Sequence, residues 1–375
     1  MWCVRFAGLA GQGRSLSLPL IDSCQNSRNA ALIDTSTATC RGLGTMAHFS
    51  NLSDFVQQLP KTETHLHLEG SLPLELARKL DPEKFAEPPP YWRPDFRFHD
   101  FAEFQEQFDR YFFHWFVSPE NYYDSCKIVF ERLVAQNCVY LEASFHLGVA
   151  ENLSVPFREV ARAIHAASPP ELELRLFLGM FRDHYQGALA GLLDEAITWD
   201  EIAGVDLHGF EHPAFQRWSA EVWSRVRSLG KVTKAHAGEF SSAEDVRQAV
   251  IDLGVRRVQH GLRAIDDPAV VEILKTEGVT LDITPISNVK LMAVPSMREH
   301  PIRQFMRAGI NCTISTDDPM LFGNSLNDEY MALANAADFT RGDLVQLARN
   351  GFAVADLSTE RKQEFFARLD QTLGA

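Results

Sequence analysis

Short apolar runs rich in β-branched residues alternate with helical stretches along the chain after Met46. Eight runs have the length of a strand, at 62–68, 139–145, 173–179, 204–209, 232–238, 256–261, 280–286 and 311–317. Helical patterns include those at 156–167, 215–230, 242–254, 267–278 and 300–309. Strands that alternate with helices are joined by right-handed crossovers into a parallel sheet. Eight repeats therefore predict a closed (β/α)₈ barrel of the TIM type.

The segment from Pro73 to Gln136 interrupts this repeat after the first strand. It contains the aromatic-rich sequence FAEFQEQFDRYFFHWF, so we expect extra helices there. An open doubly wound sheet is the alternative architecture, but no GxGxxG motif follows the first strand. Length alone suggests two domains, although α/β barrels commonly use such a length for one. We expect residues 46–375 to form a single barrel domain.

Residues 1–45 differ from the rest of the chain. They are rich in Ser, Arg and Gly and show no hydrophobic periodicity. The stretch LPLIDSC is too short and too polar for the apolar core of a secretory signal. We expect residues 1–45 to be a disordered leader or the product of an upstream start.

Charge and cysteine content restrict the possible partners and compartment. The formal net charge of -14 argues against binding to nucleic acid or to anionic membranes. It is compatible with a small neutral substrate, and no apolar run approaches the length that spans a bilayer. The six cysteines include no CxxC pair, which favours a reducing compartment, the cytoplasm, over a disulfide framework.

Histidines and carboxylates gather where the predicted strands end. In THLHLEG, His65 and His67 share one face of a strand, roughly 6–7 Å apart along it. The later strands end with Asp206, His208 and Gly209, with His236, Gly238 and Glu239, with His260, with Ser287 and Asn288, and with Asp317 and Asp318. A barrel places these ends at one face, where active sites lie.

Three imidazoles and one carboxylate suit Zn²⁺, with a water molecule completing the coordination. We predict one zinc ion per chain, bound by His65, His67, His236 and Asp317. Glu239 can act as the acid if its surroundings keep it protonated.

The side chain of His260 can orient a hydroxide or stabilise charge during attack. Successive residues point in different directions, so Asp317 and Asp318 are expected to face the metal and the substrate respectively. The sequence TDDP also fits a turn before a helix, with Asp318 as N-cap and Pro319 at the first helical position.

Taken together, these motifs resemble one enzyme family. ETHLHLEGSL, DLHGFE, AHAGE, QHG, SN and STDDP occur in the order seen in the adenosine deaminase family, from about residue 59 to residue 357. The resemblance implies a barrel with one catalytic zinc and the hydrolytic deamination of a 6-aminopurine to a 6-oxopurine and ammonia. It implies the same four zinc ligands, and Glu239 as the residue that protonates the purine ring nitrogen beside the reacting carbon.

Further roles follow from the resemblance alone. A hydroxide oriented by His260 and Asp317 would attack C6 of the purine. Asp318 would hydrogen-bond the five-membered ring, and the backbone of Gly209 would meet the other edge of the base. His67 and Glu69 are expected on the substrate side of the same site.

The motifs leave the substrate within the family open. Glu69 stands where nucleoside-specific members often carry Asp, and EASFHLG lacks the Arg and Pro common in adenosine-specific members. TPISNVKL followed by EHP resembles the adenine deaminase branch, whereas Gly209 is typical of nucleoside deaminases, and aminodeoxyfutalosine deaminases share HLEG. We predict adenosine or an adenosine-like nucleoside as substrate, with adenine or aminodeoxyfutalosine as alternatives. The side chains of His146, His184 and His208 are candidates for pocket contacts, or ordinary polar residues.

Other enzyme and protein classes fit the motifs less well. A two-metal amidohydrolase usually needs a bridging Lys at the end of the fourth strand, where this chain has DLHG. A cytidine-deaminase-type zinc enzyme needs PCxxC, which is absent. A non-catalytic purine-binding relative would typically have lost a ligand or the acid, but all the motif positions are filled. The motifs carry no information on oligomeric state.

Overall fold

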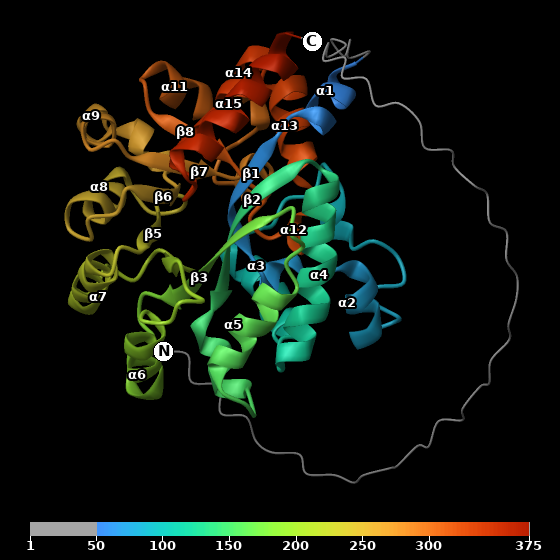
Figure 1. The fold of residues 1–375 in the computed structure, drawn as a ribbon, viewed down its shortest axis with the longest axis vertical. Helices are drawn as coiled ribbons and strands as arrows, with labels where there is room; N and C mark the ends of the chain where they lie inside the picture. Colours follow the sequence, from blue (N-terminus) through green and yellow to red (C-terminus); the bar gives the residue numbers. More distant parts are fainter. Residues whose placement is uncertain (1–50, 375) are drawn as a thin grey trace, which may run out of the picture. The chain divides into compact units, whose positions relative to one another are not determined.

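The computed structural model describes residues 51–374, so the prediction for residues 1–45 lies outside the described residues. Within this range eight parallel strands form one sheet in the order of the sequence (Figure 1). The strands are β1 (Lys61–His67), β2 (Cys138–His146), β3 (Glu173–Phe181), β4 (Gly204–His208), β5 (Val232–Ala237), β6 (Arg257–His260), β7 (Thr280–Ile283) and β8 (Asn311–Ile314). The predicted (β/α)₈ barrel is confirmed, and each strand overlaps one of the eight predicted runs.

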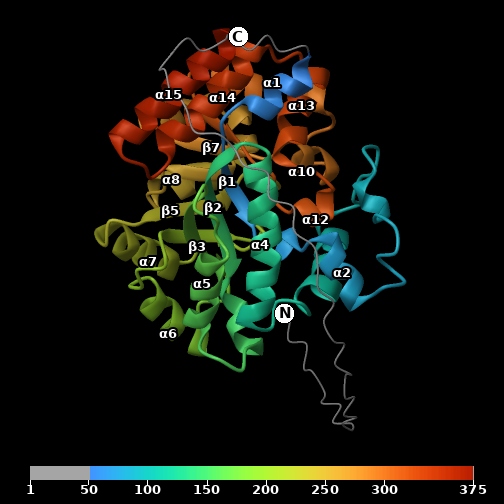
Figure 2. The same ribbon diagram turned by 45° about the vertical axis from the view of Figure 1, so that its right-hand side comes forward.

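Helices follow most of the strands. They are α1 (Leu52–Gln58), α2 (Leu74–Leu80), α3 (Phe101–Gln107), α4 (Pro119–Ala135), α5 (Phe157–Ala166), α6 (Gly187–Ala196), α7 (Arg217–Ser228), α8 (Ala243–Ile251), α9 (Pro268–Thr276), α10 (Pro285–Lys290), α11 (Ile302–Arg307), α12 (Pro319–Phe322), α13 (Leu326–Ala336), α14 (Arg341–Val354) and α15 (Thr359–Gly374). Figure 2 shows α1, α13, α14 and α15 side by side at one end of the barrel. No helix in residues 51–374 combines the length and apolar character that crossing a membrane requires.

The insertion after β1 contains the extra helices expected from its aromatic sequence. These are α2, α3 and α4, with a π-helical turn at Phe108–Phe112 directly after α3. Ser118 caps α4, because its hydroxyl accepts the backbone N–H of Asn121. Phe101 and Phe104 of α3 and Phe108 at the start of the π turn line the pocket at the strand ends, so this insertion forms one wall of the candidate site.

The predicted end of the seventh strand is wrong. The run 280–286 was expected to be extended, but β7 stops at Ile283 and α10 begins at Pro285. Proline has no backbone N–H to donate to a sheet, and its fixed φ suits the first position of a helix. Ser287 and Asn288 therefore lie on a short helix, not at a strand end.

The barrel closes where β1 meets the residues after β8. Leu66 and Asp317 form a parallel bridge, in which the N–H of Asp317 donates to the carbonyl of His65 over 2.9 Å. The N–H of His67 donates in turn to the carbonyl of Asp317 over 3.0 Å. On its other side, β1 carries one residue more than β2 between Glu63 and Leu66. Such a bulge changes the direction of neighbouring side chains, here directly beside His65.

Charged side chains fill part of the barrel interior below the site. The guanidinium of Arg257 lies 2.8 Å from Asp282 and 2.9 Å from Glu142, and Lys234 lies 2.5 Å from the Glu142 carboxylate. All four side chains are buried. Removing one partner of such a network would leave an uncompensated buried charge, so these ion pairs hold β2, β5, β6 and β7 together across the barrel interior.

Lys61, the first residue of β1, is a buried amine without a carboxylate partner in the described residues. Its Nζ donates to the carbonyls of Val56 and Leu59 over 2.6 and 2.7 Å. Burial lowers the pKa of Lys61 from 10.5 to about 7. Between these values the unfolded chain binds a proton that the folded chain does not, so stability rises with pH in this window.

We therefore expect Lys61→Met to remove a pH-dependent part of the stability. The free energy of unfolding of the wild type, relative to the variant, should rise by up to about 1.4 kcal/mol per pH unit between pH 7 and 9. Urea unfolding at several pH values measures this difference. Parallel pH profiles for the two proteins would contradict the neutral state of Lys61.

Candidate active site

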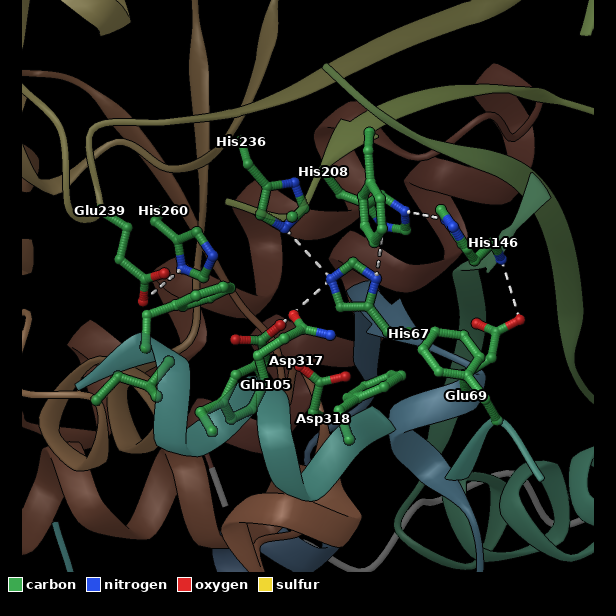
Figure 3. A pocket seen from close by; sticks show the side chains of 17 residues that line it. His67, Glu69, Gln105, His146, His208, His236, Glu239, His260, Asp317 and Asp318 are labelled. Atoms are coloured by element: carbon green, nitrogen blue, oxygen red, sulfur yellow. Dashed lines mark hydrogen bonds and ion pairs between the residues drawn. The ribbon is translucent and has the colours of Figure 1, made fainter. Parts of the chain in front are cut away.

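A pocket opens at the C-terminal ends of the strands, as the barrel fold requires (Figure 3). Its polar lining consists of His67, Glu69, Gln105, His146, His208, His236, Glu239, His260, Asp317 and Asp318. Its apolar lining is mostly aromatic and comes from the insertion after β1 and from β3, with Leu291 at the end of α10. All the predicted site residues except His65 line this pocket, and His65 lies directly beneath it, in contact with His67 and His236.

Four side chains from β1, β5 and the loop after β8 converge on one point. The Nε2 atoms of His65, His67 and His236 lie 3.1–3.3 Å from one another. Asp317 Oδ1 lies 3.3 Å from both His65 Nε2 and His67 Nε2. A tetrahedral metal site with bonds of about 2.0–2.1 Å has edges of about 3.3 Å between donor atoms. The structure thus brings together all four predicted ligands at the spacing of a metal site.

The second ring nitrogen of each histidine determines where the lone pairs point. His65 Nδ1 lies 3.3 Å from the carbonyl of Asp282, and His236 Nδ1 lies 3.3 Å from the carboxylate of Asp206. Both partners only accept hydrogen bonds, so both Nδ1 atoms carry the proton. The Nε2 lone pairs of His65 and His236 are then directed at each other and at the Asp317 carboxylate. Such a cluster is repulsive unless a cation lies between the donors.

Electrostatics favour positive charge at the same point. Burial opposes a charged ring at His67, but Asp318 and Asp317 outweigh it and raise the pKa of His67 to about 9. The four candidate ligands are all buried. Nitrogen and oxygen donors, a tetrahedral spacing and an attractive field together describe a group that can hold a metal ion.

His260 lies near these donors but differs from them. It approaches His65, His236 and Asp317 within 4.8 Å and could by distance be a ligand. However, the amide Nδ2 of Asn288 lies 3.1 Å from His260 Nδ1, and an amide nitrogen can only donate. His260 Nδ1 therefore accepts, and its Nε2 carries the proton and has no lone pair for a metal. This assigns His260 a place beside the metal group, not in it.

Glu239 lies in a setting that keeps it protonated. Its carboxyl is buried, and burial together with the nearby carboxylates of Asp317 and Glu211 raises the pKa of Glu239 well above its ordinary value. Asn288 Nδ2 donates to Glu239 Oε1 over 2.7 Å. That bond occupies Oε1 as an acceptor and leaves Oε2 as the oxygen that carries the proton.

Glu211 holds the loop that bears Glu239. Its carboxylate accepts the backbone N–H groups of Glu239, Phe240 and Ser241 over 2.9–3.1 Å. Sequence reasoning gave Glu211 no role, although it is the last residue of the DLHGFE motif. Asn288 was placed at a strand end without a role, and its contact with both Glu239 and His260 depends on the helix α10 that begins at Pro285.

The side chains of Asp317 and Asp318 point in different directions and have different partners. Asp317 has a positive φ of 68° and accepts the Ser287 hydroxyl at Oδ2 over 2.7 Å, so its Oδ1 is directed at the histidines. Asp318 precedes Pro319 at the start of α12, but its side chain makes no capping bond. Its Oδ1 is buried without a hydrogen-bond partner among the described residues. A Cβ at Gly70 would lie only 1.7 Å from this oxygen, so the glycine of HLEG makes room for it.

The other predicted pocket residues divide into two groups. Gly209 has a φ of 81° and lines the pocket, and His146 and His208 also line it. Glu69 reaches the pocket, but its Oε1 already accepts the Tyr122 hydroxyl over 2.5 Å and the N–H of His146 over 3.0 Å. His184 is absent from the lining and has an ordinary half-exposed side chain.

Comparison with known proteins agrees with this geometry. The family model described as "Adenosine deaminase" matches residues 60–372, which is most of the chain. The chain belongs to the adenosine deaminase family. It is therefore a hydrolase that acts on carbon–nitrogen bonds of cyclic amidines, as the motifs predicted.

Individual relatives resemble the chain over nearly their whole length. An adenine deaminase from Hahella chejuensis is 32% identical over 338 residues, which cover 86% of this chain and 99% of the relative. The crystal structure of an adenine deaminase from Arthrobacter aurescens has a TM-score of 0.75 and 25% identity, covering 84% of this chain and all of that one. An amidohydrolase from Burkholderia ambifaria, crystallised with bound zinc, shares the fold with a TM-score of 0.73 and 22% identity, covering 88% and 97%.

We expect a divalent metal to stabilise the folded protein through the four converging donors. Adding zinc to metal-depleted protein should raise the unfolding temperature, since a ligand present at 100 times its dissociation constant adds about 2.7 kcal/mol. His236→Ala should abolish this increase. His99→Ala, which changes an exposed histidine, is the matched control. Equal stabilisation of His236→Ala and the wild type in a thermal melt would show that the metal binds elsewhere.

Proposed function

We propose that the protein is a zinc-dependent aminohydrolase that removes the 6-amino group of a 6-aminopurine, with the free base adenine as its preferred substrate. The observation that carries this proposal is the group of four metal donors beside a protonated Glu239 and an unpartnered Asp318. A nucleophile, an acid and a hydrogen-bonding group for the base are then available in one pocket. The relatives named as adenine deaminases support the same substrate.

The donor set fits zinc. Three histidines and one carboxylate at tetrahedral spacing are typical of that ion, and His65, His67, His236 and Asp317 would hold it. When bound, zinc lowers the pKa of a water molecule toward neutrality and so supplies a hydroxide nucleophile.

The chain's own residues supply the proton transfers and the orientation. Glu239, with its proton on Oε2, donates to the ring nitrogen next to C6 and makes that carbon more electrophilic. His260, which carries its proton on Nε2, donates a hydrogen bond on the attacking side. Asp318 hydrogen-bonds the five-membered ring, and the backbone of Gly209 meets the opposite edge of the base. Overall, one water molecule is consumed: its oxygen bonds to C6 as the C6–N bond breaks, one of its protons leaves with the amino group as ammonia, and the other replaces the proton that Glu239 gave to the ring of the 6-oxopurine.

The pocket wall favours a free base over a nucleotide. Five phenylalanines form most of the apolar lining, Phe101, Phe104, Phe108, Phe113 and Phe181. None of the described lining residues is Lys or Arg, so a phosphate would find no cationic partner there. A ribose needs hydrogen-bonding groups, but Oε1 of Glu69 is already bonded to Tyr122 and His146, and the phenylalanine-rich wall offers Gln105 as its polar side chain. A flat aromatic base needs only the polar groups around the metal donors.

Glu239→Gln should leave zinc binding intact and lower kcat by about 10²–10⁴-fold, the range typical of a general acid. Gln has the same shape but cannot donate the acidic proton. Inductively coupled plasma mass spectrometry measures the zinc content. The loss of adenine absorbance measures the turnover. Near-normal turnover of this variant with zinc bound would show that Glu239 is not the general acid.

A substrate panel tests the preference for the free base. Ammonia release should give the highest kcat/KM for adenine, a lower value for adenosine and deoxyadenosine, and the lowest value for AMP. Aminodeoxyfutalosine belongs in the same panel. A higher kcat/KM for any nucleoside than for adenine would show that the free base is not the preferred substrate.

A further inference from the structure

His67 differs from the other two candidate ligands in the partner of its second ring nitrogen. His65 Nδ1 faces a carbonyl and His236 Nδ1 faces a carboxylate, as described above. His67 Nδ1 instead lies 3.4 Å from His208 Nδ1. A metal-binding histidine usually donates its other N–H to an oxygen acceptor, which sets its tautomer and the plane of its ring. In this protein the Nδ1 atom of His67 faces the ring of His208 instead of an oxygen acceptor.

A third histidine continues the contact away from the metal group. His208 Nε2 lies 2.9 Å from His146 Nδ1, so the three rings form a row from β1 across β4 to the end of β2 (Figure 3). All three side chains are buried. Phe181 packs against the middle and the far ring of the row, with centroids 5.3 Å from His208 and 4.1 Å from His146.

Two glycines provide the space for this row. A Cβ at Gly179 would lie 2.3 Å from His208 Cε1, and a Cβ at Gly148 would lie 2.4 Å from His146 Nε2. Any other residue at these positions would displace the rings. The row is therefore supported by the backbone of β3 and of the loop after β2, and is not a chance contact of long side chains.

Hydrogen-bond chemistry gives the row one direction. If His67 binds a metal through Nε2, its Nδ1 carries the proton and donates to His208 Nδ1. His208 then carries its own proton on Nε2 and donates to His146 Nδ1. The backbone N–H of His146 donates to Glu69, which belongs to the HLEG loop just after His67. The outer end of the row, at His146, is thus hydrogen-bonded to the loop that directly follows His67.

We propose that His208 and His146 are positioning residues that hold His67 in the tautomer and ring orientation required for zinc binding. This inference rests on the proposed zinc site. His208 acts on His67 directly, and His146 acts through His208. Burial lowers the pKa of His146 to about 3, which agrees with a neutral ring whose Nδ1 accepts.

A second metal ion is the rival explanation for the same residues. His67, Asp206 and His208 lie within 4.8 Å of one another and could by distance hold a cation. However, the two oxygens of Asp206 already accept hydrogen bonds, from His236 Nδ1 over 3.3 Å and from the Ser144 hydroxyl over 3.0 Å. Those bonds favour the hydrogen-bonded row, and the zinc content of the protein separates the two explanations.

The test compares two substitutions at His208. His208→Leu keeps the volume but removes the acceptor, whereas His208→Asn keeps an acceptor oxygen near the position of Nδ1. We expect His208→Leu to weaken zinc binding about 10–100-fold in competition with a chelator. His208→Asn should stay within about threefold of the wild type, because its Oδ1 still accepts from His67. The visible absorption spectrum of the cobalt-substituted protein should change in His208→Leu and be retained in His208→Asn.

His146→Leu tests the outer part of the row. It should weaken zinc binding less than His208→Leu does, and adding it to His208→Leu should have no further effect, because contacting residues are not additive. His184→Leu is the matched control, since its ring lies 6.4 Å from that of His146 and outside the pocket lining. If His208→Leu does not fold, His208→Asn and His146→Leu still test the proposal.

Three results would overturn the proposal. The first is wild-type zinc affinity and an unchanged cobalt spectrum in His208→Leu. The second is the binding of two zinc ions by the wild type and of one by His208→Leu, which would assign the row to a second metal. The third is equal loss of affinity in His208→Asn and His208→Leu. Failure of the wild type itself to bind zinc would instead contradict the proposed function.

Discussion

The candidate site depends on the hydrogen bonds that close the barrel between its first strand and the segment after its last. The bridge between Leu66 and Asp317 joins the backbone of the two segments that carry three of the four candidate metal donors. Asp317 holds a left-handed backbone conformation there, which costs free energy for a residue other than glycine. Because closure determines where the donors stand, metal binding and barrel stability are linked.

Barrel closure also brings together groups that repel one another. Histidine lone pairs and a carboxylate meet at 3.1–3.3 Å, and Glu239 lies close to further carboxylates. The repulsion between these groups is unfavourable for folding. Hydrogen-bond partners beneath and beside the site nevertheless hold the rings and carboxyls in place. Asp282 and Asp206 orient the rings of His65 and His236, Asn288 donates to the Glu239 carboxyl, and Glu211 holds the backbone of the loop that bears Glu239. A cation between the donors would offset the repulsion and, in the proposed function, would supply the chemistry of the site.

The pocket combines two parts of different origin. Residues on β1, β5 and β6 and in the loops after β5 and β8 supply the candidate metal donors, Glu239 and Asp318. The insertion after β1 supplies the aromatic wall, and β2 and β4 supply the histidine row beside His67. In the proposed function the first part carries out the reaction, and the second part provides the surface that selects the substrate. We therefore expect residues such as Phe104 and His146 to determine which substrate the pocket prefers.

The sequence by itself determined the barrel, because eight apolar runs separated by helices have few other ways to bury their faces. It also determined the candidate metal donors and Glu239, because a barrel gathers all its strand ends at one rim whatever the details of packing. Tertiary structure alone decided the roles of Asn288, Glu211 and the histidine row. Asn288 reaches Glu239 only because a helix begins at Pro285, and His208 reaches His67 only because Gly179 leaves space for its ring. Contacts of this kind depend on distances between elements far apart in the chain, and a linear pattern of residue types does not contain those distances.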